Sequence, residues 1–288
     1  AGPYCENLGS ITIEWTEGGK KLLSDYHLTP IDGTLPENRE ITALVDRWKG
    51  LVGGTYLAPY GLTYDQVLTV SGFDLLTPES GVQSGSPLGE LVADSFLWAV
   101  ENLEKDAPDV PTVTVTADGV LRAPLYPGEI TTSMAFDVLS MGVGSDGTSG
   151  FPLVGVYLTG KELKAAAEVD ASVTPLMPAA QLYMAGLEYS FNTHRMFFNR
   201  VTDIRLRWNI TVTADVEMVD AEGNQVPPPT FTHDFYEEIK DDQLYRVVTG
   251  MYSAQMLGTV KSRSMGLLSL EPKMADGSPV IDFEDCIL

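Results

Sequence analysis

The sequence predicts a mixed α+β fold, in which helices pack against a mixed sheet. Two segments, Glu40–Leu51 and Pro87–Leu103, carry apolar residues at the three- and four-residue spacing of an amphipathic helix. A third segment, Val110–Thr116, is β-branched almost throughout, which is typical of a buried strand. Helix and strand signals follow one another along the chain without an internal repeat, so an all-helical or all-strand fold is not expected.

The first 52 residues are expected to form a hairpin and a helix. Apolar residues alternate with polar ones around Ile11–Trp15, Gly18-Gly19 supplies a turn, and Lys21–Leu28 follows as a second strand. The segment Glu40–Leu51 then places five apolar residues on one helical face, and glycines supply the stop. The face consists of Ile41, Leu44, Val45, Trp48 and Leu51, and the glycines are Gly50, Gly53 and Gly54.

Further elements are expected beyond residue 86. The helix Pro87–Leu103 is expected to bury Leu88, Leu91, Val92, Ser95, Phe96 and Ala99. Shorter helices are expected at Ser133–Leu139 and Lys161–Val169. Strands are expected at Leu153–Leu158, Leu187–Phe191, Val201–Thr213 and Tyr245–Gly250, with the run Pro227–Pro229 in a loop.

The charge of the chain restricts its binding partners. The 288 residues include 40 acidic and 18 basic residues, which gives a net charge of −22. Because the acidic residues are dispersed, they predict a solvated surface that repels nucleic acid and anionic lipid. An anionic substrate would therefore be held by a few local cations. No run of apolar residues is long enough to predict a membrane-spanning helix.

Two cysteines, Cys5 and Cys286, lie near the two ends of the chain. They form one disulfide in an oxidising compartment, or they are two unrelated thiols, and the sequence leaves both alternatives open.

Two short motifs suggest chemistry that their context does not support. Asp25-Tyr26-His27 spells D-x-H, an element of dimetal phosphatases, but the remaining histidines are scattered, and we expect no metal site in this chain. The run Gly142–Gly147 matches G-x-G-x-x-G but leads into a strand, so we expect no dinucleotide site. Its glycines either expose backbone N–H groups to a pocket or form a plain flexible loop.

Five blocks of the sequence, in order, resemble the C-terminal domain of the 5'-nucleotidase family, which includes UDP-sugar hydrolases and cyclic phosphodiesterases. Ser86–Ser95 resembles the family's helix start, x-x-G-N-L-x-x-D-A. Val115–Arg122 resembles its strand ending in N-G-G-G-I-R. The remaining blocks are Gly128–Thr131 with Val138–Met141, Leu158–Leu163 with Glu168, and Tyr245–Thr249.

The resemblance implies a division of the chain into two parts. Residues 1–52 resemble the tail of a metallophosphoesterase domain and the helix that follows it, and residues 53–288 resemble the substrate-binding domain. In the family, a pair of divalent metals in the N-terminal domain hydrolyses the phosphoester. We therefore expect no catalytic residue and no cofactor in this chain, no activity of the chain alone, and the metallophosphoesterase domain of the same polypeptide as its partner. Family members are mostly exported, which implies a periplasmic or extracellular location.

The resemblance also implies a set of substrate contacts. In the family, two aromatic rings sandwich a nucleoside base while arginine, asparagine and aspartate side chains hold its edges and ribose. Arg122 matches the arginine of N-G-G-G-I-R, and Tyr252 and Met141 match the two aromatic positions. The expected substrate-binding residues are Arg122, Tyr252, Met141, Asp118, Gly142 and Gly144.

The chain departs from the family pattern at several of these positions. Ala117 replaces the asparagine, Met141 is not a ring, and Met256–Thr259 lacks the aspartate of the G-G-D-G loop. An insertion, about Val143 to Gly150, lies beside the expected pocket. Either the pocket is rebuilt for a different phosphoester, or the domain is a non-catalytic interaction module that no longer binds nucleosides. A third alternative is the sulfur-oxidation branch of the superfamily, which acts on a thiosulfonate group.

Overall fold

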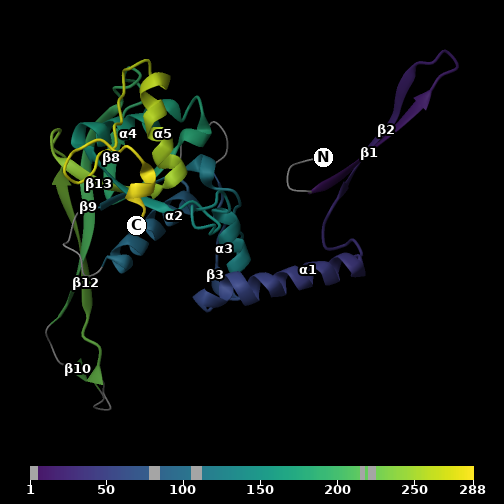
Figure 1. Ribbon diagram of the computed structural model, residues 1–288, viewed down its shortest axis with the longest axis horizontal. Coiled ribbons are helices and arrows are strands. Elements are labelled where there is room, and N and C mark those ends of the chain that lie inside the picture. The colour runs from purple at the N-terminus through teal and green to yellow at the C-terminus, as the bar shows by residue number, and fades with distance from the viewer. Residues whose placement is uncertain (1–5, 78–84, 105–111, 215–217, 220–224) are drawn as a thin grey trace. The chain divides into compact units, whose positions relative to one another are not determined.

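The structure is a computed structural model that describes residues 6–77, 85–104, 112–214, 218–219 and 225–288. It divides into two units, residues 1–66 and residues 67–288. Both are drawn in Figure 1, and each unit is considered by itself below.

The first unit contains the expected hairpin and helix. β1 (Asn7–Trp15) pairs antiparallel with β2 (Lys21–Pro30), and the two strands are joined by the turn at Gly18-Gly19. α1 (Arg39–Val52) begins after Asn38, whose side chain accepts hydrogen bonds from the backbone N–H groups of Glu40 and Ile41. This is the usual way in which an asparagine satisfies the first free N–H groups of a helix.

The glycines after α1 do not stop the helical path. It continues as a π-helical turn, Gly53–Leu57, and a 3-10 turn, Ala58–Tyr60, and ends at Gly61 in the left-handed region with φ 68°. Lys49 forms an ion pair with Asp65 at 3.1 Å, which holds the segment after these turns against α1. Glycine lowers helix stability without forbidding helical backbone angles, so local contacts determine whether the helical path continues.

The apolar stripe of α1 is exposed in the first unit. Ile41, Leu44, Val45, Trp48 and Leu51 have exposed fractions between 45 and 59%. An amphipathic helix normally buries such a stripe, because its burial supplies most of the stability of the helix.

The second unit is built on a four-stranded mixed sheet with the order β6-β13-β4-β7. β13 (Leu244–Gly250) pairs parallel with β4 (Thr112–Ala117), and both outer pairs are antiparallel. The outer strands are β6 (Leu153–Thr159) and β7 (Leu182–Ala185). The expected mixed sheet is confirmed.

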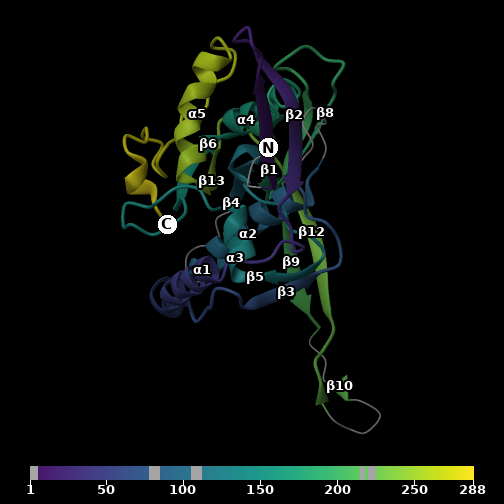
Figure 2. The same cartoon turned by 90° about the vertical axis from the view of Figure 1, so that its right-hand side faces the viewer.

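Helices cover both faces of this sheet. α2 (Pro87–Leu103) packs against β4 and β7, while α4 (Gly160–Val173) and α5 (Met251–Arg263) contribute to the apolar cluster on the other face. Figure 2 shows α5 running beside β6 and β13. β4 separates the two layers, since Val113 enters the α4–α5 cluster and the Thr114 hydroxyl donates to the carbonyl of Ala93 in α2 at 2.7 Å.

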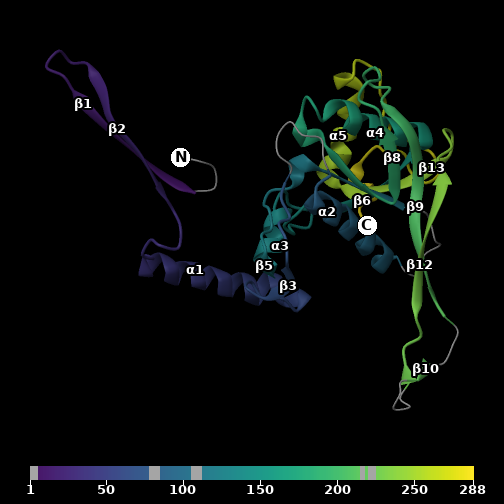
Figure 3. The same cartoon turned by 180° about the vertical axis from the view of Figure 1, so that it is seen from behind.

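The remaining strands form smaller sheets. β3 (Val67–Ser71) pairs with β5 (Gly128–Thr131), which leads into α3 (Thr132–Val138). β8 (Leu187–Phe191), β9 (Val201–Thr213) and β12 (Thr230–Glu238) form an antiparallel sheet of order β12-β9-β8. β9 and β12 form a long arm (Figures 1 and 3), from which β10 (Met218–Val219) and β11 (Gln225–Val226) continue. The 3-10 turns are η4 (Asp118–Val120), η5 (Pro178–Ala180) and η6 (Phe283–Cys286).

Two sequence-based expectations about helices are wrong. Residues Met256–Thr259, matched to a family loop, lie inside α5, because Ala254, Leu257 and Val260 face the core at helical spacing. In α2, Leu91 is 49% exposed and Ser95 is also exposed, so the buried stripe is rotated from the expected one. The buried residues of α2 are Leu88, Gly89, Val92, Ala93 and Val100.

Two buried carboxylates attach α4 to its neighbours. Glu168 accepts a hydrogen bond from the backbone N–H of Val201, the first residue of β9, at 2.6 Å. Asp170 accepts one from the N–H of Leu182, the first residue of β7, at 2.9 Å, and one from the Tyr189 hydroxyl of β8 at 2.6 Å. Acceptors of this kind offset the cost of burying the donors. The two carboxylates therefore fix the starts of β9 and β7 and the position of β8 relative to α4.

A third carboxylate of α4 holds the C-terminal segment. Glu162 completes a capping box with Thr159 and accepts hydrogen bonds from the Lys273 ammonium at 2.7 and 2.8 Å. Burial alone would raise the pKa of Glu162, but the hydrogen bonds from Lys273 and Thr159 outweigh it, and the pKa is lowered overall. Lys273 also bridges to Tyr157 of β6, so residues near 273 are fixed against the sheet.

The cysteine pairing falls partly outside the described residues. Cys286 lies in η6 with a buried sulfur that forms no disulfide with a described residue, and burial raises the pKa of its thiol. Cys5 lies outside the described residues, so the two alternatives for this pair stay open.

Gly89→Ala should destabilise the protein, although alanine normally favours a helix. A Cβ at Gly89 would lie 2.3 Å from the Tyr183 ring of β7, so we expect a loss of about 2 kcal/mol or more in the free energy of unfolding. The matched variant Gly258→Ala, in α5, meets nothing within 4 Å and should gain about 0.5–1 kcal/mol. Urea unfolding of the two variants measures the contrast, and equal midpoints would contradict it.

Glu162→Gln should lower stability by about 2 kcal/mol at neutral pH, because it weakens a charged hydrogen-bonded pair with Lys273. The folded pKa of Glu162 lies below its unfolded value, so its contribution is present above the unfolded pKa and is lost as the pH falls through the folded pKa. The difference from wild type should therefore shrink in acid. Urea midpoints at several pH values check this, with the exposed Glu101→Gln as control, and a pH-independent difference would refute it.

Candidate ligand pocket

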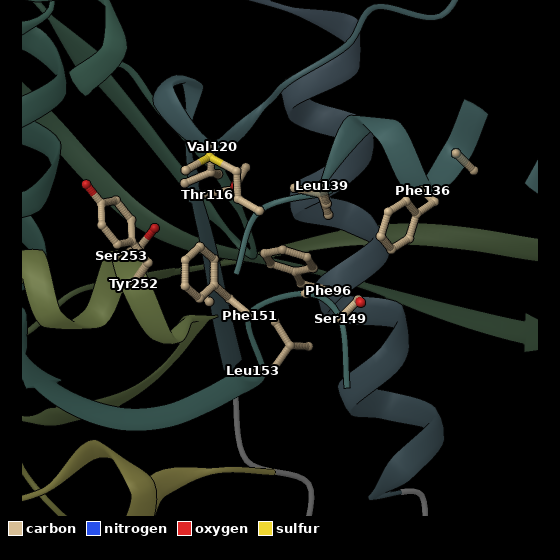
Figure 4. A pocket seen from close by; sticks show the side chains of 14 residues that line it. Phe96, Thr116, Val120, Phe136, Leu139, Ser149, Phe151, Leu153, Tyr252 and Ser253 are labelled. Atoms are coloured by element: carbon tan, nitrogen blue, oxygen red, sulfur yellow. The ribbon is translucent and has the colours of Figure 1, made fainter. Parts of the chain in front are cut away.

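A pocket of about 260 Å³ lies at one edge of the four-stranded sheet, where the parallel strands β4 and β13 end and β6 begins. Crevices at the carboxyl ends of parallel strands commonly hold ligands. Figure 4 shows its side chains. The lining residues are Phe96, Thr116, Val120, Ala135, Phe136, Leu139, Met141, Ser149, Gly150, Phe151, Leu153, Gly250, Tyr252 and Ser253.

None of the fourteen lining residues carries a charge. Four of them are aromatic, and hydroxyl groups come only from Thr116, Ser149, Tyr252 and Ser253. An apolar wall with a few polar groups is the usual composition of a small-molecule site. A charged part of a ligand would have to remain outside this pocket.

Phe151 and Tyr252 are stacked, with ring centroids 5.4 Å apart and an angle of 24° between the ring planes. Phe151 follows the glycine-rich loop, and Tyr252 lies in the first turn of α5. A backbone hydrogen bond from Met251 to Pro152, at 2.9 Å, joins the two segments next to the rings. The stack is therefore held from both of its chain segments.

Gly142 makes the position of Phe151 possible. Its φ of +89° is in the region that favours glycine, and a Cβ there would lie 2.5 Å from the Phe151 ring. Any larger residue at 142 would displace the ring.

The loop 142–150 forms a small closed hairpin. The N–H of Gly144 donates to Thr148, that of Gly147 to Gly144, and that of Gly150 to Gly142, at 2.8 to 3.0 Å. Asp146 accepts from both the N–H and the hydroxyl of Thr148. The N–H groups of these three glycines are thus already used in hydrogen bonds within the loop.

Thr116 stands out among the buried threonines of the sheet. The hydroxyls of Thr114 and Thr249 donate to backbone carbonyls at 2.7 Å. Thr116, on the same face of β4 as Thr114, is 1% exposed, and its hydroxyl has no hydrogen-bond partner among the described residues. A buried unsatisfied hydroxyl costs about 1–3 kcal/mol, which a ligand can recover.

The structure brings some of the expected site residues together. Met141 and Tyr252 line the pocket. Gly142 and Gly144 belong to the adjoining hairpin but do not line it. Arg122 is exposed, and Asp118 is half-buried; neither is a lining residue, although Val120 between them is one. Substrate binding by these six residues stays a prediction.

The most prominent side chain of the pocket was missed from the sequence. Phe151 directly follows the glycine-rich loop, and an aromatic residue beside an insertion at an expected pocket was the available signal. Thr116, in the middle of a β-branched strand, carried no signal of its own, because only the missing hydrogen-bond partner distinguishes it from Thr114.

Half-buried Asp118 and buried Tyr183 form a polar pair next to the pocket. Burial raises the pKa of Asp118, and the nearby Tyr183 hydroxyl opposes this only in part. Burial and the Asp118 carboxylate raise the pKa of Tyr183 as well. Within the described part of the chain, Oδ1 of Asp118 and the hydroxyl of Tyr183 are both buried without a well-formed hydrogen bond. The two groups therefore do not fully compensate each other's burial.

Metal ligands are not clustered in the described part of the chain. No group of three or more histidine, cysteine, aspartate or glutamate residues there is arranged to hold a metal ion. Asp25 and His27 of the D-x-H motif lie on β2, in the first unit. In the same described residues, every helix is too short or too polar to cross a bilayer.

Comparison with known proteins identifies the family. The model for "5'-nucleotidase, C-terminal domain" matches residues 67–260. This chain belongs to that family. Among curated protein sequences, none matches it.

This 5'-nucleotidase C-terminal domain chain spans less than half the length of three solved structures that it matches. A 5'-nucleotidase precursor from Thermus thermophilus has a TM-score of 0.56 and 21% identity, over 87% of this chain and 41% of its own. An NAD nucleotidase from Haemophilus influenzae has a TM-score of 0.47 and 16% identity, over 91% and 46%. The sulfate thiohydrolase SoxB from Thermus thermophilus has a TM-score of 0.48 and 17% identity, over 96% and 45%.

Asp118→Asn should stabilise this 5'-nucleotidase C-terminal domain at neutral pH. The folded pKa of Asp118 is raised, so the wild type loses stability as the pH rises from the unfolded pKa through the folded pKa, and an amide does not. The variant should therefore have the higher urea midpoint at neutral pH, and the gain should disappear in acid. The exposed Asp137→Asn on α3 is the control, and equal midpoints at neutral pH would contradict the expectation.

Proposed function

We propose that this chain is the substrate-recognition part of a 5'-nucleotidase-like phosphoesterase. The observation that carries the proposal is the uncharged pocket at the sheet edge, which contains both positions matched to the family's base-stacking residues, Met141 and Tyr252. Membership of the family and the concave apolar site support a role in binding a nucleoside or a related phosphoester.

The chain would bind the two ends of such a substrate differently. The base enters the uncharged pocket, where apolar and aromatic side chains exclude water. The phosphate stays outside, near the exposed Arg122, which lies two residues beyond the lining residue Val120. A local arginine is needed because the net charge of −22 opposes an anion at long range. The N-terminus of α5, which begins at the pocket, also favours negative charge.

Hydrolysis is assigned to another domain of the same polypeptide. A metallophosphoesterase domain N-terminal to this chain would hold two divalent metals, which polarise the phosphoryl group and supply the attacking water. The described residues of this chain contain no suitable cluster of ligands, so their part is to bind and orient the substrate. The 5'-nucleotidase precursor from Thermus thermophilus is matched over only 41% of its length, which leaves room for such a domain.

The exposed apolar face of α1 supports a domain partner. In the first unit by itself, Ile41, Trp48 and Leu51 are 50 to 59% exposed, as are several apolar residues of β1 and β2. Burial of this face by the metallophosphoesterase domain would recover about 25 cal/mol for each Å² of apolar surface. A periplasmic or extracellular location belongs to the same proposal, by analogy with the family.

A non-catalytic interaction module is the second candidate. It is favoured by the direct stacking of Phe151 on Tyr252, which covers one face of the Tyr252 ring. The two candidates differ in whether the chain binds a nucleotide.

Calorimetric titration of this chain with adenosine, AMP, uridine, a UDP-sugar and ribose 5-phosphate tests the proposal. We expect AMP to bind at least about tenfold more tightly than adenosine, because of a charge-assisted contact to Arg122. Arg122→Ala should remove this difference, whereas Arg207→Ala, an exposed arginine on the arm, should not. No binding by either this chain or the full-length protein would reject substrate recognition and favour the interaction module.

A further inference from the structure

The Phe151–Tyr252 stack determines where a flat ligand can lie in the pocket. A ring inserted between two aromatic faces needs about 7 Å between them, which is two van der Waals spacings. The centroids of Phe151 and Tyr252 are only 5.4 Å apart. No further ring fits between them. A ligand ring therefore cannot be sandwiched between Phe151 and Tyr252 in this arrangement.

The rest of the pocket lies on the other side of Phe151. Figure 4 shows the Phe151 ring in the middle of the lining side chains, with Tyr252 on one side and Phe96, Leu139 and Phe136 on the other. In the same view, Val120 and Thr116 lie above the Phe151 ring. All of them line one cavity, so the part bounded by Phe96 and Leu139 lies on the side of Phe151 that faces away from Tyr252.

The size and chemistry of this space restrict its ligand. A cavity of about 150 Å³ holds benzene, so the 260 Å³ found here is sufficient for a two-ring group. A lining without charges favours a neutral ring, because a charge would lose its hydration without gaining a partner. At the wall, the Thr116 hydroxyl is the one lining group that is buried and without a protein partner in the described residues.

Phe151 is fixed in this position before any ligand arrives. Gly142 leaves the space that its ring occupies, the hairpin 142–150 closes on itself, and the backbone bond from Met251 to Pro152 anchors the next residue. A ring held in its binding position loses little further freedom when a ligand stacks on it.

From these observations we infer that Phe151 is the specificity-determining ring of this pocket, in place of an aromatic residue at position 141. It stacks a flat, uncharged, one- or two-ring group of the ligand on the face opposite Tyr252, and the Thr116 hydroxyl is the hydrogen-bond partner of a polar atom on that group. The inference rests on the proposed function, because it names the part of the substrate that the pocket selects.

The test is calorimetric titration of the full chain with adenine and benzimidazole, which are neutral two-ring molecules, and with ribose 5-phosphate. We expect both rings to bind. Phe151→Leu, which keeps an apolar side chain but removes the ring, should weaken both by about tenfold or more. Thr116→Val should weaken adenine by about tenfold while the unfolding midpoint stays the same or rises.

A pair of glycine variants keeps the test valid if Phe151→Leu fails to fold. Gly142→Ala displaces the Phe151 ring, whereas Gly147→Ala, at φ +81°, strains the same hairpin without meeting any atom within 4 Å. Only Gly142→Ala should weaken ring binding by about tenfold.

The inference is overturned if neither ring binds, if Phe151→Leu leaves ring affinity unchanged, or if it raises affinity, which would make Phe151 a plug over Tyr252. Unchanged adenine affinity in Thr116→Val overturns the assignment of its hydroxyl. A different set of results would reject the proposed function alone. In that case the rings would still bind through Phe151, but AMP would bind no better than adenine and Arg122→Ala would have no effect.

Discussion

The parallel pairing of β4 with β13 is the contact on which the rest of the second unit depends. It joins residues 112–115 to residues 246–249, which are separated by most of the domain, and leaves one helix-covered face on either side. Since parallel neighbours end at the same edge, Thr116 and Gly250 arrive together at the pocket. β6, paired antiparallel on the far side of β13, starts from that edge and brings Phe151 and Leu153 with it. Closing such distant segments is entropically costly, and the buried carboxylates of α4 help to offset that cost.

Much of the fold could be predicted from local sequence signals. The hairpin, α1, α2, α3 and β9 were expected close to their observed bounds, because their hydrophobic period or β-branched content is strong. β3, β5, β7 and β12 were not expected, since short strands depend on partners elsewhere in the chain more than on their own residues. α5 was missed for a different reason. The family pattern placed a loop there, while the spacing of Ala254, Leu257 and Val260 indicates a helix.

The candidate site was predictable only where it follows the family pattern. Met141 and Tyr252 were expected from that pattern and do line the pocket. Phe151 and Phe96 were not expected, because the meeting of α2 with the residues after the glycine loop is a tertiary event. In α2, the carbonyl of Ala93 accepts the hydrogen bond of the Thr114 hydroxyl. The next threonine on that face, Thr116, is buried without such a partner in the described residues. No periodicity in the sequence encodes such a difference.

The closed hairpin at residues 142–150 allows one wall of the pocket to change while the sheet and the helices stay the same. Its ends meet through the hydrogen bond from Gly150 to Gly142, and its internal N–H groups are satisfied by its own carbonyls. Loops that satisfy their own backbone can be lengthened, shortened or replaced at little cost to the scaffold. A change of ligand in this lineage therefore does not require a new sheet or a new helix. Exchange of a short segment that carries its own closing hydrogen bonds, together with the ring that follows it, is sufficient to alter what the sheet edge accepts.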